Sequence, residues 1–158
     1  MEKIYVGIDI GNSGAIAVMQ DGQISDIFEM PVTTLAKRKT SCRQGIKHLL
    51  QFPQEAVVIV EECSQHLQSQ KTAASMWFGF RGVLDAIEEC HLRYVIVSPK
   101  TWQKEFSFKS GNTKGQSIAT CKSLFPTLSL KRTDSSKNDD DNFSDAVLLA
   151  EYGRRNNL

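Results

Sequence analysis

A short apolar run in the middle of the chain constrains the fold more than any other feature. Residues 56–61 read AVVIVE, an almost unbroken series of apolar and β-branched side chains that ends in an acid. A strand of this kind is covered on both faces, as strands are inside a parallel sheet flanked by helices. The sequence therefore predicts an α/β architecture with helices on both faces of the sheet.

The N-terminal part of the chain predicts an antiparallel meander of three strands. Residues 3–10 alternate and are rich in β-branched residues, and 15–20 form a second run of the same kind. Asp21-Gly22 is a strong signal for a two-residue hairpin turn, after which 23–30 form the third strand.

Helices and strands alternate after the meander. The order of the longer elements is β-β-β-α-β-α-β-α-α, which resembles the RNase H-like fold with its mixed five-stranded sheet. A polar loop is expected at 127–140. Helices are predicted at 40–52, 71–90, 99–106, 113–124 and 142–154, and the last two strands at 56–61 and 93–97.

Length and composition predict one globular domain over residues 1–158. No apolar run approaches 18 residues, and the N-terminus lacks the pattern of a signal peptide. We therefore expect a cytoplasmic protein of the nucleoid or of a phage-infected cell, with an organelle as the alternative if a transit peptide was removed. The four cysteines show no spacing typical of a metal site and are expected to be free thiols.

Charge is unevenly distributed although the net charge is only +1. Residues 96–137 carry eight lysines and arginines against two acids, and no acid lies between Glu29 and Glu55. Acids gather instead at Glu61-Glu62 and at 139–145. Segregated basic stretches suit a polyanion, and clustered acids suit a cation site, although solvated helix faces are an equally ordinary explanation.

Several acids fall where strands end or a helix begins. Asp9 lies near the end of the first apolar strand, where a carboxylate is costly unless it is paired or binds a metal; capping the following turn is the alternative. Glu61 ends the buried run, and the residues alone do not choose between it and Glu62. Asp141 and Asp145 are one helical turn apart and share a face, although acids in a first helical turn also serve as caps.

Acids from separate elements that converge at one sheet edge suit phosphodiester hydrolysis by two divalent metal ions. One ion generates the attacking hydroxide, and both stabilise the transition state. Mg²⁺ prefers oxygen ligands and keeps several waters, so three or four carboxylates are enough to hold the ions.

Five segments of the sequence, in the order in which they occur along the chain, resemble RuvC-type Holliday junction resolvases, most closely their small phage, bacterial and organellar members. The resemblance implies a homodimer that binds a four-way DNA junction and nicks two strands symmetrically, with two Mg²⁺ or Mn²⁺ ions per active site and no small-molecule cofactor. The segments are GIDIGNSGAIAV at 7–18, VIVEE at 58–62, SMWFGFRGVLDAI at 75–87, VSPKTWQKEF at 97–106 and DNFSDAVLLAEYGRR at 141–155.

The family's catalytic, metal-binding acids carry over to Asp9, Glu61 and Asp145. A fourth family acid stands three or four residues before the last one. Three before is Asn142, a departure from that spacing, and four before is Asp141. We therefore expect Asp141 as the fourth ligand and Asn142 as a weak one.

The resemblance also indicates surfaces for a partner subunit and for DNA. Glycines inside the long helix leave room for a second helix, so this helix is the expected dimer contact, with packing inside the domain as the alternative. The dimer residues are Phe78, Gly79, Gly82 and Val83. The expected DNA contacts are His66, Gln68 and Lys71 in the loop after Glu61, for which an ordinary polar loop is the alternative, and Lys100, Lys104, Lys109 and Lys114 as phosphate contacts.

Other functions fit parts of the same pattern. GIDIGNSG also resembles the first phosphate-binding turn of sugar and acetate kinases, but those enzymes close two such domains around ATP and lack the acid pair before AVLLAEYG. A nuclease that acts on RNA–DNA hybrids or other branched DNA is a further alternative, as is a catalytically weak junction-binding protein.

Overall fold

The computed structural model describes residues 3–63 and 70–158. The strands are β1 (Ile4–Asp9), β2 (Ala15–Gln20), β3 (Gln23–Glu29), β4 (Val32–Leu35), β5 (Arg38–Ser41), β6 (Val57–Glu61) and β7 (Arg93–Val97). The helices are α1 (Arg43–Leu49), α2 (Gln70–Glu89), α3 (Pro99–Glu105), α4 (Thr113–Leu124) and α5 (Asp141–Arg155).

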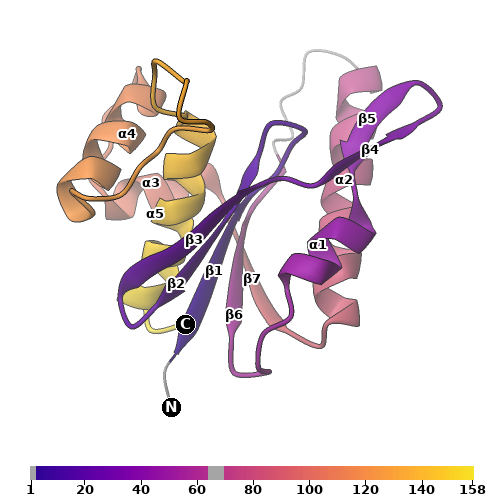
Figure 1. Ribbon diagram of the computed structural model, residues 1–158, viewed down its shortest axis with the longest axis horizontal. Coiled ribbons are helices and arrows are strands. Elements are labelled where there is room, and N and C mark those ends of the chain that lie inside the picture. Colours follow the sequence, from indigo (N-terminus) through magenta and orange to yellow (C-terminus); the bar gives the residue numbers. More distant parts are fainter. Residues whose placement is uncertain (1–2, 64–69) are drawn as a thin grey trace.

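Five strands form one mixed sheet in the order β3-β2-β1-β6-β7 (Figure 1). β1, β2 and β3 are antiparallel, whereas β6 runs parallel to both β1 and β7. Helices α1 and α2 cover one face, and α5 with α3 and α4 covers the other. The predicted α/β fold, with a mixed five-stranded sheet between two helical layers, is confirmed.

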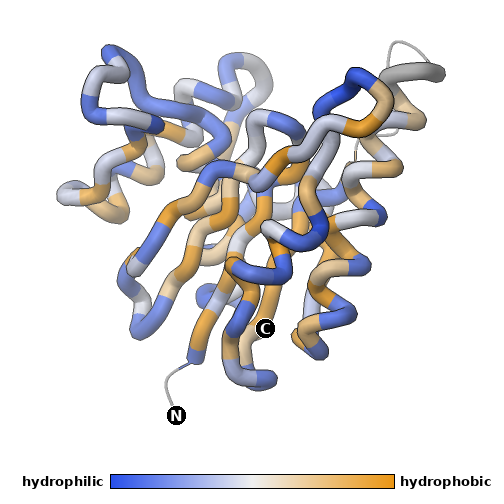
Figure 2. The backbone as a smooth tube through the Cα atoms, turned by 45° about the vertical axis from the view of Figure 1, so that its right-hand side comes forward, coloured by the Kyte–Doolittle hydropathy of each residue, from blue (hydrophilic) through white to orange (hydrophobic). Residues whose placement is uncertain are grey.

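Two hydrophobic cores, one on each face, follow from the alternation of side chains along the strands. Tyr5 and Ile59 point to the core under α5, and Val6 and Val58 point to the core under α1 and α2. Figure 2 shows how hydrophobic residues follow the strands of the sheet and the inner sides of the helices.

Close contact between α5 and β1 depends on Gly7. A Cβ atom at this position would lie 2.0 Å from the carbonyl oxygen of Ala146 and 2.6 Å from the amide nitrogen of Ala150. The absence of a side chain therefore lets the helix lie directly on the strand. This approach brings the first turns of α5 beside the end of β1, where Asp9 lies.

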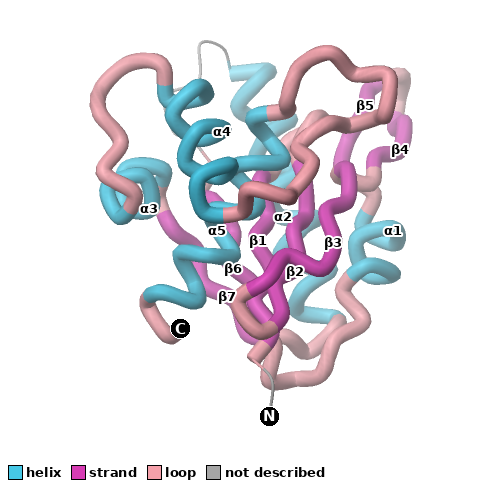
Figure 3. The backbone as a smooth tube through the Cα atoms, turned by 60° about the vertical axis from the view of Figure 1, so that its left-hand side comes forward, coloured by secondary structure: helices cyan, strands magenta, loops and turns pink. Residues whose placement is uncertain are grey.

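A second, two-stranded sheet departs from the prediction. β4 and β5 form a hairpin beside α2, and α1 consequently begins at Arg43 instead of at residue 40 (Figures 1 and 3). Its turn holds Ala36 and Lys37 at φ of 47° and 64°. Neither residue type favours the left-handed region, so the sequence offers none of the glycine or asparagine that signals such a turn.

Two smaller expectations concern the cysteines and the membrane. All four cysteines are free, as predicted. Within residues 3–63 and 70–158, no helix has the length and apolar character needed to cross a bilayer.

Candidate active site

The carboxyl ends of β1 and β6 and the N-terminus of α5 meet at one edge of the sheet, the upper edge in Figure 1. Ile8 pairs with Val60 in the parallel register, so Asp9 and Glu61 come next along the two strands. Both follow the residue whose side chain faces α2, which turns them to the face that α5 covers. Asp145, one turn into α5, completes the group.

Asp9 is the most deeply buried of these acids, with 7% of its surface exposed. Burial raises the pKa of its carboxyl well above the ordinary value, and neighbouring acids raise it further. In decreasing order of effect, these neighbours are Glu61, Asp145, Asp141 and Asp140. The acids predicted from the sequence are therefore close enough to repel one another.

Glu61 is held by an aromatic donor from α3. The indole Nε1 of the fully buried Trp102 donates a hydrogen bond of 2.7 Å to Oε2 of Glu61. Burial raises the pKa of Glu61, and the indole bond opposes this without cancelling it. The indole N–H needs a partner when the ring is buried, and no pattern in the sequence indicates that Glu61 is this partner.

Asp145 is held from α4. The hydroxyl of Ser117 donates to Oδ1 of Asp145, and Ser117 also bonds to Ser144 at 2.8 Å. Burial raises the pKa of Asp145 to about 7, against the lowering effect of the Ser117 bond, and the charge of Glu61 adds to the rise. Ser117 was not predicted, because a serine inside a helix gives no sequence signal of such a role.

Asp140 and Asp141, at the start of α5, have different bonding partners. Asp140 is the N-cap of α5: its Oδ1 accepts from the backbone N–H of Asn142 at 2.9 Å and of Phe143 at 3.3 Å. The Asn142 side-chain amide also donates to Asp140, at 3.1 Å. Both Asp140 and Asp141 add to the repulsion around Asp9, and Asp141 also pairs with Lys114 at 3.0 Å.

The donor set suits a hard divalent cation, because every predicted strong ligand is a carboxylate and their mutual repulsion is only partly offset. In the described part of the chain, no three acidic, histidine or cysteine side chains are already arranged as ligands of one ion. Three of the carboxylates are bonded instead to Trp102, Ser117 and Lys114. A bound cation would relieve the repulsion that the indole, the hydroxyl and the lysine only partly offset.

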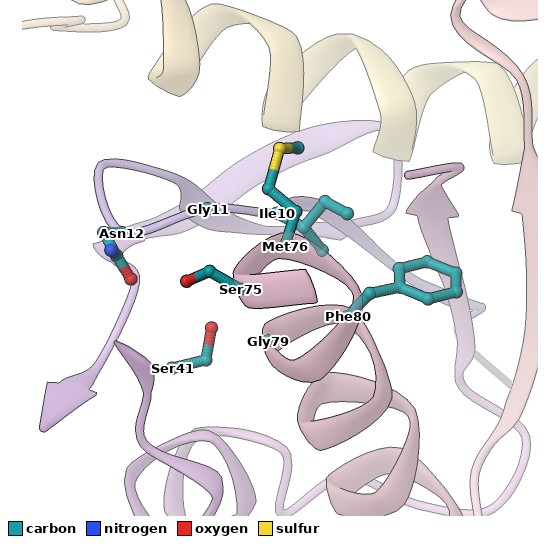
Figure 4. A pocket seen from close by; sticks show the side chains of 8 residues that line it. All are labelled: Ile10, Gly11, Asn12, Ser41, Ser75, Met76, Gly79 and Phe80. Carbon is teal, nitrogen blue, oxygen red and sulfur yellow. The ribbon is translucent and has the colours of Figure 1, made fainter. Parts of the chain in front are cut away.

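A small pocket is lined by the turn that follows Asp9, by β5 and by α2 (Figure 4). Asn12 of this turn, Ser41 of β5 and Ser75 of α2 contribute polar groups to it. Asn12 also donates a hydrogen bond of 3.1 Å to the carbonyl of Lys39. The β4–β5 hairpin is therefore tied to the turn that carries the chain away from the acid cluster.

The lysines predicted to contact phosphates lie on α3, on α4 and between them. Lys114 reaches the acid cluster itself, and Lys100, Lys104 and Lys109 are exposed without an ion pair among the described residues. His66 and Gln68 lie outside the described residues, as does the side chain of Lys71.

The predicted dimer residues of α2 do not all face outward. Phe78 is 61% exposed, and a Cβ atom on Gly82 would meet open space. Gly79 faces Ser41 of β5, since its Cβ would lie 3.4 Å from that hydroxyl. Val83 is fully buried against the sheet and packs within the chain, which corrects its assignment to an interface.

Comparisons by sequence and by structure give different results. No protein-family model matches the sequence, and no curated protein matches it either. The structure resembles RuvC of Thermus thermophilus in complex with a Holliday junction substrate, with a TM-score of 0.64 and 13% identity over 97% of this chain and 95% of that one. A second Thermus thermophilus RuvC structure gives a TM-score of 0.59 and 12% identity, over 98% and 96% of the chains.

A viral protein extends the likeness. The fowlpox virus Holliday junction resolvase gives a TM-score of 0.54 and 14% identity, over 98% of this chain and 99% of that one. The chain therefore has the RuvC-type resolvase fold, within the RNase H-like class, as the sequence predicted.

Proposed function

We propose that this protein is a metal-dependent endonuclease that resolves four-way DNA junctions. The observation that carries the proposal is the group of acids from β1, β6 and α5, which lie together with their repulsion only partly offset. Burying like charges is costly, and a fold keeps such a group where a cation or a reaction makes use of it. The likeness to three structures of junction resolvases supports this choice of substrate.

The cofactor in this proposal is Mg²⁺ or Mn²⁺, two ions per active site, held by Asp9, Glu61, Asp141 and Asp145 with Asn142 as a weak ligand. When bound, the ions supply a hydroxide nucleophile and stabilise the charge of the transition state. The chain itself orients the ligands: Trp102 fixes Glu61, and Ser117 fixes Asp145. Such supporting hydrogen bonds keep metal ligands in place.

Symmetric cleavage requires two active sites, so we propose a homodimer that nicks two strands of the junction. The described part of α2 supports this, because Trp77 and Phe78 are both exposed on it and Gly82 leaves open space beside them. An exposed aromatic pair on a helix is typical of a surface that another chain covers. Roles in DNA recombination and repair would follow from this activity.

The test is cleavage of end-labelled substrates by purified protein in Mg²⁺, Mn²⁺ or EDTA. The substrates are a four-way junction, a linear duplex of the same sequence and an RNA–DNA hybrid, and the Asp9→Asn variant is the control. Paired nicks in the junction alone, lost in EDTA and in the variant, are the expected result. Cleavage of the hybrid with an intact junction would contradict the proposal and indicate a nuclease of RNA–DNA hybrids.

A further inference from the structure

We propose that the β4–β5 hairpin is a phosphate-binding arm for the duplex that leads into the acid cluster. This inference rests on the proposed function, since it names how one part of the substrate is held. It concerns residues 36–39, a segment outside the predicted DNA contacts.

The hairpin carries concentrated positive charge that nothing nearby neutralises. Lys37, Arg38 and Lys39 follow one another at its tip, and all three are exposed. None of them forms an ion pair within the part of the chain that the structure describes. Arg43 and Lys47, further along the chain, are instead paired with Glu89. The unpaired charges therefore gather at the tip.

The turn places a lysine where a glycine would be easier. Ala36 and Lys37 both adopt positive φ, a region that costs ordinary L-residues free energy and that glycine enters freely. Backbone strain of this kind persists where the surroundings or a function maintain it. Presenting a cationic side chain at the outermost point of a tight turn is one function that would maintain this strain.

The hairpin is fixed relative to the active-site edge. At its base, the N–H of Cys42 donates to the carbonyl of Pro31 at 2.7 Å, and Asn12 holds Lys39 through its carbonyl. Asn12 lies three residues after Asp9. The arm and the acid cluster are thus joined through one short turn, and both lie at the upper edge in Figure 1.

Basic groups consequently flank the acid cluster on two sides. The hairpin lies beside α2, whereas Lys104 and Lys109 lie on the other side of the sheet with α3 and α4 (Figures 1 and 3). Without metal, a DNA backbone that crosses the acids meets repulsion there, and cations on either side offset it. The two basic groups supply these cations, and a phosphate backbone is the ligand class that matches their charge.

The first experiment compares glycine substitutions at the two turn positions. Lys37→Gly removes a charge and relieves the strain, and Ala36→Gly relieves the strain alone. Binding of a fluorescent four-way junction is measured by anisotropy in EDTA, over a range of KCl concentrations. We expect Lys37→Gly to bind about threefold to tenfold more weakly with a salt slope smaller by about one, and Ala36→Gly to bind like wild type. Both variants should melt at or above the wild-type temperature.

The second experiment matches the charge removed. Arg38→Ala/Lys39→Ala is compared with Lys3→Ala/Arg93→Ala, which removes two exposed positive charges at the opposite edge of the sheet. The hairpin variant should bind the junction more weakly and reduce the salt slope by about two. The Lys3→Ala/Arg93→Ala variant should change the affinity and the salt slope much less, although it removes the same charge.

The outcomes separate this inference from the proposed function. If the wild-type protein cleaves the junction and the hairpin variants bind like their controls, the proposed role of the hairpin is overturned and the proposed nuclease function stands. A hairpin variant that dissociates into monomers in light scattering, with unchanged binding per chain, would make the hairpin a subunit contact and also overturn the arm. If the wild-type protein neither binds nor cuts any junction, both the role of the hairpin and the proposed nuclease function are overturned.

Discussion

Two acids on α5 respond to burial in opposite ways. Glu151 is only 3% exposed, yet hydrogen bonds from Arg154 and Arg155 outweigh its burial and lower the pKa of its carboxyl. Asp145, six residues earlier, is raised to a pKa of about 7, because burial and the charge of Glu61 prevail over the bond from Ser117. One helix thus holds a compensated acid near its end and an uncompensated acid near its start.

This difference separates an acid that supports the fold from an acid to which the proposed function assigns a metal ion. The arginine bonds at Glu151 are 2.7–2.8 Å long and satisfy both carboxylate oxygens, which leaves nothing for an ion to add. At Asp145 the repulsion among acids remains, and a divalent cation would remove it. Burial alone therefore does not mark a reactive acid; burial beside like charges does.

The largest expected effect is that of Asp145→Asn. Junction cleavage in Mg²⁺ should fall about a thousandfold or more, because one carboxylate of the metal site is lost. The metal-free protein should meanwhile melt at a higher temperature at pH 8, since an amide keeps the shape without the charge. Calorimetric melting in EDTA checks this second part, and a lower melting temperature would mean that the acids do not repel one another.

Trp102→Phe tests the support that Glu61 receives from a residue outside the acid cluster. Without the indole N–H, Glu61 loses its donor, and cleavage should fall about 10- to 100-fold with weaker Mn²⁺ binding. Phe108→Leu is the control, since Phe108 packs edge-on against Trp102 with ring centroids 5.6 Å apart but does not bond to Glu61. An equal loss in both variants would assign the effect to packing and not to the hydrogen bond.

The pH dependence of stability should follow Asp145 and not Glu151. A carboxyl with a raised pKa binds more protons in the folded than in the unfolded state between about pH 4 and 7. The metal-free protein should therefore lose about 2 kcal/mol of unfolding free energy as the pH rises from 5 to 8, measured by urea unfolding. The lowered pKa of Glu151 places its own contribution below this window. Asp145→Asn should reduce the slope to the part that the raised pKa values of Asp9 and Glu61 contribute, and Glu151→Gln should leave it unchanged.

Glu151→Gln gives the smallest expected effect. Its arginines are 44% and 32% exposed in their side chains, so water can solvate them once the carboxylate is gone. We expect a loss of about 1 kcal/mol in unfolding free energy, with junction cleavage within twofold of wild type. A large loss of cleavage would break the comparison, because it would connect the compensated acid to the active site.

Much of the fold follows from local patterns in the sequence. The apolar run ending at Glu61 and the Asp21-Gly22 turn predicted their strands because hydrophobic alternation and turn chemistry act over a few residues. The β4–β5 hairpin was not predictable, since its strands are exposed and its turn uses alanine and lysine at positive φ.

The candidate site was predicted in its acids but not in their supports. Asp9 and Glu61 each end a strand, and they converge because neighbouring parallel strands end at the same edge of a sheet. The hydrophobic pattern of the sequence reveals both strands. The contacts of Trp102 and Ser117 join elements far apart in the chain, and no spacing encodes them. The burial of Val83 likewise depends on which side of α2 the sheet covers.

The most direct test of the central claim is Mn²⁺ binding by isothermal titration calorimetry at pH 8, with wild type, Asp145→Asn and Glu151→Gln. The acid cluster predicts equal binding by wild type and Glu151→Gln, and weak or no binding by Asp145→Asn. Equal binding by all three proteins, or by none, would contradict a metal site at this edge of the sheet.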